Sequence, residues 1–141
     1  MDKQITLDYI NGVMKNTLME TLDIKYTDIG EDFLVASMPV TPKVHQPLGL
    51  LHGGASLALA ESVGSTASHF LIDREQYEVR GIEISGNHLK SKKEGVVTAT
   101  ARVLHKGKRT HLWEIRIVDE SGALISLCKL TNIILPKESN K

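Results

Sequence analysis

Residues 53–71 read GGASLALAESVGSTASHFL, a long proline-free stretch that is rich in small side chains. A stretch of this kind predicts a helix. Gly64 and the serines near it lower the helix propensity, so packing against other elements must stabilise the segment. We therefore expect a buried central helix that its neighbours approach closely.

Downstream, the chain has the composition of a β-sheet. In residues 111–118, apolar side chains such as Trp113 alternate with mostly polar ones, as in a half-buried strand. Turns that contain a glycine, at residues 106–108 and 120–122, predict antiparallel hairpins. Four strands are expected, at residues 78–90, 95–105, 110–120 and 123–135.

Upstream of the central helix, the sequence predicts a short helix and two strands. Thr6 is the expected N-cap of the short helix. The strands are expected at residues 22–28 and 31–40, around Gly30, and a loop that contains Pro42 follows them. The apolar positions that support these elements are Leu7, Ile10, Met14 and Leu18 at helical spacing and Leu34, Ala36, Met38 and Val40 in alternation.

The order of these elements predicts an α+β fold, in which a curved antiparallel sheet wraps a long central helix. A length of 141 residues is typical of one domain, residues 1–141. A single sheet with one covered face leaves its other face and its edges without partners. We therefore expect a homo-oligomer, either a dimer or a dimer of dimers (a homotetramer).

Composition excludes several function classes. The formal net charge is +0, with 17 basic and 17 acidic residues, which does not favour general binding to nucleic acid or to a membrane surface. Bases also have few rings to stack on, since the chain has one Trp, three Tyr and two Phe. Cys128, as the one cysteine, cannot form an intramolecular disulfide. The charged N-terminus does not resemble a signal peptide, so we expect a cytoplasmic protein.

Glu61 is the only acid in the central helix, and its neighbours are Ala58, Leu59, Ala60 and Val63. A carboxylate in apolar surroundings costs several kcal/mol unless it is paired or hydrogen-bonded. Such a group suits a general base or a nucleophile. The alternative is a helix residue that simply points to solvent.

A His-Gly-Gly sequence, residues 52–54, precedes the helix. Unpaired N–H groups and the positive end of the helix dipole can stabilise the negative charge that develops on a carbonyl oxygen. The alternative is a tight turn with no chemical role. Gly53 and Glu61 lie eight residues apart, or about 12 Å along a helix axis. One chain therefore cannot easily place both on one carbonyl, whereas two antiparallel helices at a dimer interface can.

The sequence QPLGLLHGGASLALAESVGS, residues 46–65, resembles that of hotdog-fold acyl-CoA thioesterases. The resemblance is greatest to the bacterial 1,4-dihydroxy-2-naphthoyl-CoA hydrolases and the 4-hydroxybenzoyl-CoA thioesterases of the PaaI-like group, and it extends to about Leu135. It implies hydrolysis of an aryl-CoA or related acyl-CoA, such as 1,4-dihydroxy-2-naphthoyl-CoA, to the free acid and CoA. No cofactor is implied, since CoA is part of the substrate.

The resemblance also implies roles for single residues. Glu61 acts on the thioester carbonyl, through an anhydride or as the base for water, and the amide of Gly53 polarises that carbonyl. Gln46 and His52 lie beside it, and Ser65 holds the water or the carboxylate. Related phenylacetyl-CoA thioesterases usually carry Asp in place of Glu61, which favours an aryl substrate here.

Two basic clusters interrupt the neutral sequence, at residues 90–93 and 106–109. Clustered cations can bind the phosphates of CoA, although solvated surface charge is the usual reading. Lys92 and Lys93 are expected to be surface charge only. With the resemblance, the residues expected to bind substrate or CoA are Gly81, His88, Lys90, Ser91, His105, Lys106, Gly107, Lys108, Arg109 and Thr110.

Other chemistries find less support. The six histidines do not show an HExxH spacing, and there is no G-x-S-x-G sequence for a serine nucleophile, so neither a metal site nor a triad is expected. Two alternatives to a thioesterase remain: a hotdog acyl-thioester dehydratase, although the His-Phe-Pro segment of such enzymes is absent, and a non-catalytic acyl-CoA-binding module.

Overall fold

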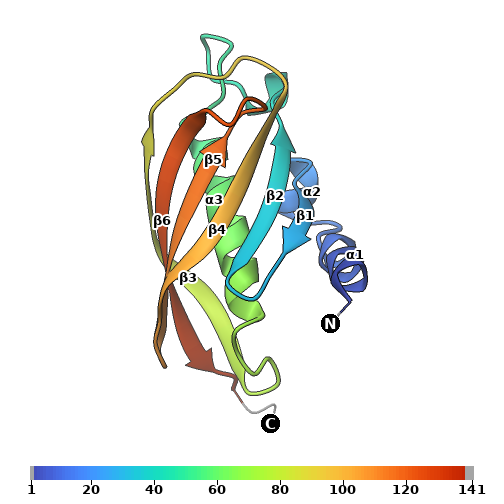
Figure 1. The fold of residues 1–141 in the computed structure, drawn as a ribbon, viewed down its shortest axis with the longest axis vertical. Coiled ribbons are helices and arrows are strands. Elements are labelled where there is room, and N and C mark those ends of the chain that lie inside the picture. The colour runs from blue at the N-terminus through green and yellow to red at the C-terminus, as the bar shows by residue number, and fades with distance from the viewer. Residues whose placement is uncertain (1, 139–141) are drawn as a thin grey trace.

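The computed structural model describes residues 2–138. Six antiparallel strands form one sheet in the order β1-β2-β4-β5-β6-β3, and the sheet curves around α3 (Figure 1). The predicted α+β arrangement is confirmed. The elements are α1 (Lys3–Val13), α2 (Leu18–Thr21), β1 (Lys25–Ile29), β2 (Phe33–Pro39), the 3-10 helix η1 (Pro42–Val44), α3 (Gly53–His69), β3 (Tyr77–His88), β4 (Val96–Lys106), β5 (Thr110–Val118) and β6 (Leu124–Pro136).

α3 is the predicted central helix, and small residues let it approach the sheet. Leu59, Ala60 and Val63 are fully buried. A methyl group added at Gly64 would lie 2.6 Å from Cδ2 of Leu130 on β6, closer than real Cβ contacts. The glycine that lowers the helix propensity therefore sets the distance between helix and sheet, as expected.

The prediction for the N-terminal helix is wrong in two respects. The N-cap is Asp2, whose carboxylate accepts from the N–H of Ile5 at 3.1 Å, and Thr6 lies inside the helix. Leu18 belongs to α2, because α1 ends at Val13 and the chain then turns at Asn16, which has a positive φ. The apolar spacing continues across this break, so periodicity alone could not show it.

The predicted strands are confirmed with shifts of a few residues at their ends, the largest at β1, which begins at Lys25 instead of residue 22. On β2 the alternation predicts the buried face correctly. Its inward side chains lie in the core together with those of β4 and β5; these core residues are Leu34, Ala36, Met38, Val97, Ala99, Ala101, Trp113, Ile115 and Ile117.

β3 is a long edge strand with little cover. Most of its twelve residues are exposed, including Ile82 at 57%. An exposed edge with free backbone groups can pair with a strand of another chain. The opposite edge of the sheet, β1, lies against α1 (Figure 1).

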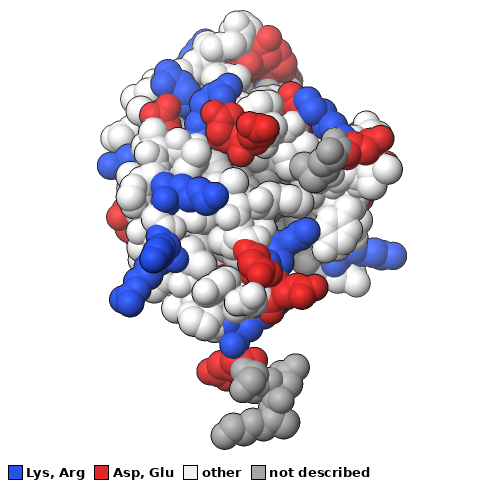
Figure 2. Space-filling model, turned by 60° about the horizontal axis from the view of Figure 1, so that its bottom comes forward, with Lys and Arg blue, Asp and Glu red and all other residues white. Residues whose placement is uncertain are grey.

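Charges of both signs alternate over the lower end of the molecule, and neither sign covers this face (Figure 2). This mixture of charges agrees with the neutral composition of the chain. Within residues 2–138, no helix combines the length and the apolar character needed to span a membrane.

Candidate active site

A hollow of about 300 Å³ lies at the N-terminus of α3. It brings together five of the predicted site residues from three separate segments: Gln46, Gly53, His88, Lys90 and Ser91. Ser56 and Ser126 also line it, and both are buried although they are polar.

The first turn of α3 has one N–H left for a ligand. His52 is the N-cap, and its Nδ1 accepts from the N–H of Gly54 at 2.7 Å. The carbonyl of His52 accepts from the N–H groups of Ala55 and Ser56. Of the first four N–H groups, only that of Gly53 is without a partner among the described residues. Gly53 is therefore the donor that could polarise a carbonyl oxygen.

The imidazole of His88 leaves no room for a side chain at residue 53. A Cβ at this position would lie 2.6 Å from Nε2 of His88. The ring is held from its other side, since Nδ1 lies 2.8 Å from Oγ of Ser126. His88 therefore places a second polar nitrogen beside the free N–H of Gly53.

Loops around the hollow hold Gln46 and His52 in place. The side-chain oxygen of Gln46 accepts from the N–H of Leu48, so the amide presents Nε2 as a donor. Because Nδ1 of His52 accepts from Gly54, a neutral ring carries its proton on Nε2. Both residues predicted to lie beside the carbonyl therefore have a donor to offer.

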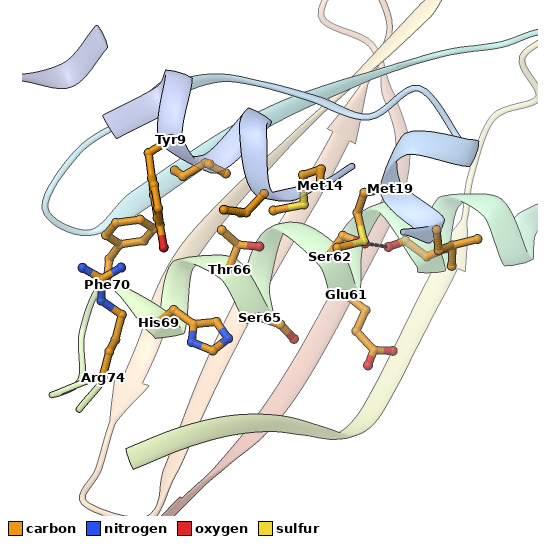
Figure 3. A pocket seen from close by; sticks show the side chains of 14 residues that line it. Tyr9, Met14, Met19, Glu61, Ser62, Ser65, Thr66, His69, Phe70 and Arg74 are labelled. Carbon is orange, nitrogen blue, oxygen red and sulfur yellow. Dashed lines mark hydrogen bonds between the residues drawn. The ribbon is translucent and has the colours of Figure 1, made fainter. Parts of the chain in front are cut away.

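Glu61 lies at a second and larger feature, an open groove of about 610 Å³ between α1, α2 and α3 (Figure 3). Glu61 and Ser65 both point from α3 to the side away from α1. Apart from these and a few other polar groups, the lining is apolar; it consists of Tyr9, Ile10, Val13, Met14, Leu18, Met19, Ala58, Glu61, Ser62, Ser65, Thr66, His69, Phe70 and Arg74.

The carboxylate of Glu61 packs directly against β3. A methyl group at Gly81 would lie 2.5 Å from Oε2 of Glu61 and 3.6 Å from Oδ1 of Asn132. Gly81 was predicted to contact the substrate or CoA. The structure supplies a different reason for the glycine, because any larger residue would displace the carboxylate.

A buried polar network beneath α3 was not predicted from the sequence. Ser65 donates to Oδ1 of Asn132 at 3.2 Å, and Nδ2 of Asn132 donates to Oγ of Ser68 at 2.8 Å. Ser68 also lies 2.7 Å from Nε1 of Trp113 and 2.9 Å from Nδ1 of His111. The signal that could have revealed it is the inward alternation of β6, which places Asn132 on the same face as Cys128 and Leu130.

Within one chain, the two halves of the predicted site lie far apart. Gly53 and Glu61 belong to the same continuous helix, so they lie about 12 Å apart along its axis. The basic turn is farther away. The backbone carbonyl of Arg109 accepts from the N–H of Ile134 on β6, whereas His88 on β3 lies opposite Ser126 of the same strand. Eight residues of β6 therefore separate the turn from His88, about 27 Å at 3.4 Å per residue.

The two basic clusters also differ in their partners. Lys90 pairs with Asp119 at 3.6 Å and Lys92 with Glu120 at 2.5 Å. Lys92 is half-buried and forms an ion pair with Glu120, so it is not the surface charge that was expected. Among the described residues, the cations of the second cluster have no carboxylate partner; they are Lys106, Lys108 and Arg109, next to His105, Gly107 and Thr110.

Comparison with known proteins shows the family to which this chain belongs. Residues 48–126 match the thioesterase superfamily. The 1,4-dihydroxy-2-naphthoyl-CoA hydrolase of Escherichia coli is 44% identical over 133 residues, which cover 94% of this chain and 97% of the relative. This chain belongs to the thioesterase superfamily.

Two further relatives of this thioesterase point the same way. The proofreading thioesterase EntH of Cronobacter turicensis is 42% identical, with coverage of 94% of this chain and 96% of the relative. A crystal structure of a mutant of the Pseudomonas aeruginosa thioesterase PA1618 has a TM-score of 0.91 at 42% identity and covers 93% of this chain and 94% of that one. The resemblance to hotdog-fold thioesterases is thus confirmed, and the protein is a thioester hydrolase.

Proposed function

We propose that this thioesterase hydrolyses an aryl-CoA, with 1,4-dihydroxy-2-naphthoyl-CoA as the first candidate, at a site that two copies of the chain share. The observation that carries the proposal is the placement of two chemical groups on α3. The free N–H of Gly53 begins the helix, and Glu61 lies two turns on, at the wide apolar groove.

The chemistry divides between these groups. The N–H of Gly53 from one copy stabilises the negative charge on the thioester oxygen, with the donors of Gln46 and His52 beside it. Glu61 from the other copy takes a proton from water as the water oxygen attacks the carbonyl carbon. The C–S bond then breaks, the CoA sulfur takes up the proton, and the acid is released. Direct attack by Glu61 through an anhydride gives the same products.

The groove supports an aromatic acyl group. Its volume of about 610 Å³ and its apolar lining suit a ring system. The E. coli relative is named as a hydrolase of a bicyclic aryl-CoA. Glu61, where related phenylacetyl-CoA thioesterases usually carry Asp, agrees with this substrate class.

A second copy is needed because of distance. About 12 Å separates Gly53 from Glu61 along α3, and a reacting atom must lie within about 3 Å of each group. An antiparallel α3 from a partner supplies the missing group at each site. The exposed edge of β3 favours such pairing, in a dimer or a dimer of dimers.

The CoA nucleotide is assigned to the basic turn. The cations of Lys106, Lys108 and Arg109 have no carboxylate partner within residues 2–138 and can bind its phosphates, with His105, Gly107 and Thr110 on the same hairpin. Lys90 and Ser91, in the hollow beside His88, are proposed to contact the pantetheine end. The reaction as proposed uses only water and the thioester, and we propose a cytoplasmic location from the single buried thiol of Cys128.

A panel of CoA thioesters tests this function. With thiol release as the readout, we expect kcat/KM to be highest for 1,4-dihydroxy-2-naphthoyl-CoA, lower for benzoyl-CoA and hexanoyl-CoA, and at least about a hundredfold lower for acetyl-CoA, which leaves the apolar groove empty. Glu61→Gln should lower kcat by about two to three orders of magnitude on every substrate. A preference for acetyl-CoA, or wild-type turnover in a folded Gln variant, would contradict the proposal.

A further inference from the structure

Ser65 and Asn132 meet beneath α3, next to the carboxylate of Glu61. Ser65 lies one helical turn beyond Glu61 on the same face, and Figure 3 shows both side chains pointing to the same side of the helix. Asn132, on β6, is fully buried, and its Oδ1 lies 3.2 Å from Oγ of Ser65. Both Asn132 and Glu61 contact the space above Gly81.

The surroundings of Asn132 determine which way its amide points. Nδ2 lies 3.3 Å from the carbonyl oxygen of Gly64 and 2.8 Å from Oγ of Ser68. The carbonyl of Gly64 can only accept, so the NH₂ group must face it. The carbonyl oxygen of Asn132 must then face Ser65. Because this oxygen can only accept, Ser65 has to donate its single hydrogen to it.

Ser68 completes the same hydrogen-bonding pattern. Its Oγ receives hydrogen bonds from Nε1 of Trp113 and Nδ2 of Asn132, neither of which can accept. Its own hydrogen therefore goes to Nδ1 of His111. The donor and the acceptor of every hydrogen bond in the network are thus determined by groups that can only donate or only accept.

We propose that Asn132 is a positioning residue that makes Ser65 a hydrogen-bond acceptor for the attacking water. With its hydrogen committed to Asn132, Ser65 offers only lone pairs toward the space beside Glu61. A water between Ser65 and Glu61 donates one hydrogen to each, which turns its own lone pair toward the carbonyl. Without Asn132, Ser65 can instead donate to the Glu61 carboxylate and compete with the water. This inference rests on the proposed role of Glu61.

Steady-state kinetics of four variants with an aryl-CoA test the proposal: Ser65→Ala, Asn132→Leu, the double variant and Asn132→Asp. We expect Ser65→Ala and Asn132→Leu each to lower kcat by about tenfold, with KM within about twofold of wild type, since a water contact is lost and substrate contacts are kept. The double variant should be no slower than either single variant, because Asn132 acts through Ser65. Asn132→Asp keeps the acceptor for Ser65 and should lose less kcat than Asn132→Leu.

The control is Leu130→Val, a change two residues along β6 that loosens the packing against Gly64 but removes none of the hydrogen-bonding groups of the network. It should lower the thermal midpoint and leave kcat unchanged. Additive losses in the double variant, a KM that rises with the fall in kcat, or an equal loss of kcat in Leu130→Val would overturn the proposal. If Asn132→Leu does not fold, an Asn132→Asp variant as slow as Ser65→Ala would overturn it equally. Wild-type turnover of Glu61→Gln would instead refute the proposed function.

Discussion

The N-terminus and the middle of α3 offer opposite kinds of hydrogen-bonding group. Near the N-terminus of α3, Gly53 and Gln46 present donors at a hollow of about 300 Å³, and His52 presents one from the N-cap. Two turns further on, Glu61 presents an acceptor at a groove of about 610 Å³. Hydrolysis of a thioester needs both kinds of group at one carbonyl. The comparison teaches that one chain carries both kinds of group but holds them about 12 Å apart along α3.

The two regions also differ in how their polar groups are held. At the hollow, the side chains of His52 and Gln46 each bond to a backbone N–H two residues further along the chain. The groove is apolar and open, and its polar groups are held by a network that reaches across the sheet to His111 and Trp113. The donors of His52 and Gln46 therefore depend on contacts that are local in the sequence. The polar groups beside Glu61 depend instead on contacts between α3 and distant strands.

Mixing two inactive variants should give the largest effect and tests the shared site directly. Glu61→Gln lacks the base, and in Gly53→Val the β-branched side chain would collide with His88 and block the donor. Each should lose at least about two orders of magnitude in kcat. With random exchange, about half of the dimers are mixed, and each has one intact site. Activity should therefore rise to roughly a quarter of wild type per total site.

The control for this experiment is the same mixture under conditions that prevent exchange of subunits, which should stay inactive. Both variants must be folded dimers by circular dichroism and size-exclusion chromatography. A coexpressed heterodimer that shows no activity would place the whole site within one chain and would contradict the two-helix site.

The basic turn should give an intermediate effect. Replacing Lys106, Lys108 and Arg109 by Ala should raise KM for a CoA thioester by about tenfold, since three exposed phosphate contacts each contribute little. The same acyl group on pantetheine, which lacks the nucleotide, should show no change. Lys93→Ala serves as a matched control, because this exposed cation was expected to be surface charge only. Equal effects on both substrates would show that the turn acts through structure.

The smallest effect concerns His111, the buried end of the network. Burial, with smaller effects from the Lys106 and His105 charges, lowers the pKa of His111 below its usual 6.5. The unfolded chain then binds a proton at a higher pH than the folded chain. The resulting stability is fully present above pH 6.5 and is lost as the pH falls toward the folded pKa. His111→Asn, which keeps an acceptor for Ser68, should reduce this loss.

The measurement is the free energy of unfolding in urea at pH 7.5 and at pH 5.5. Part of the pH dependence should remain in the variant, since burial also lowers the pKa of His69. An undiminished difference between the two pH values would show that His111 is not buried in its neutral form.

Local patterns in the sequence predicted most of the fold. Alternation in residues 31–40 and 111–118 placed the buried faces of β2 and β5 correctly, because a strand exposes alternate side chains whatever its partners are. Helix ends were less certain. The apolar spacing from Leu7 to Leu18 continued across a real break, since periodicity reports a buried face and not the path of the backbone.

By itself, the sequence determined the chemistry that α3 carries. An acid eight residues beyond the first glycine of the His-Gly-Gly turn sets a separation of about 12 Å on any helix, so the expectation of a second copy follows from helical geometry alone. The helix start also determined that the free donor belongs to its first turn.

Only the tertiary structure decided which groups surround that chemistry. Gly81, Asn132 and Glu61 are separated by many residues, and they meet because β6 pairs with β3 beneath α3. Lys90 and Lys92 likewise form ion pairs with the turn after β5, whereas the cations at residues 106–109 have no carboxylate partner among the described residues. Contacts of this kind depend on strand order and register, which arise from packing of the whole chain and leave no mark on the local spacing of residues.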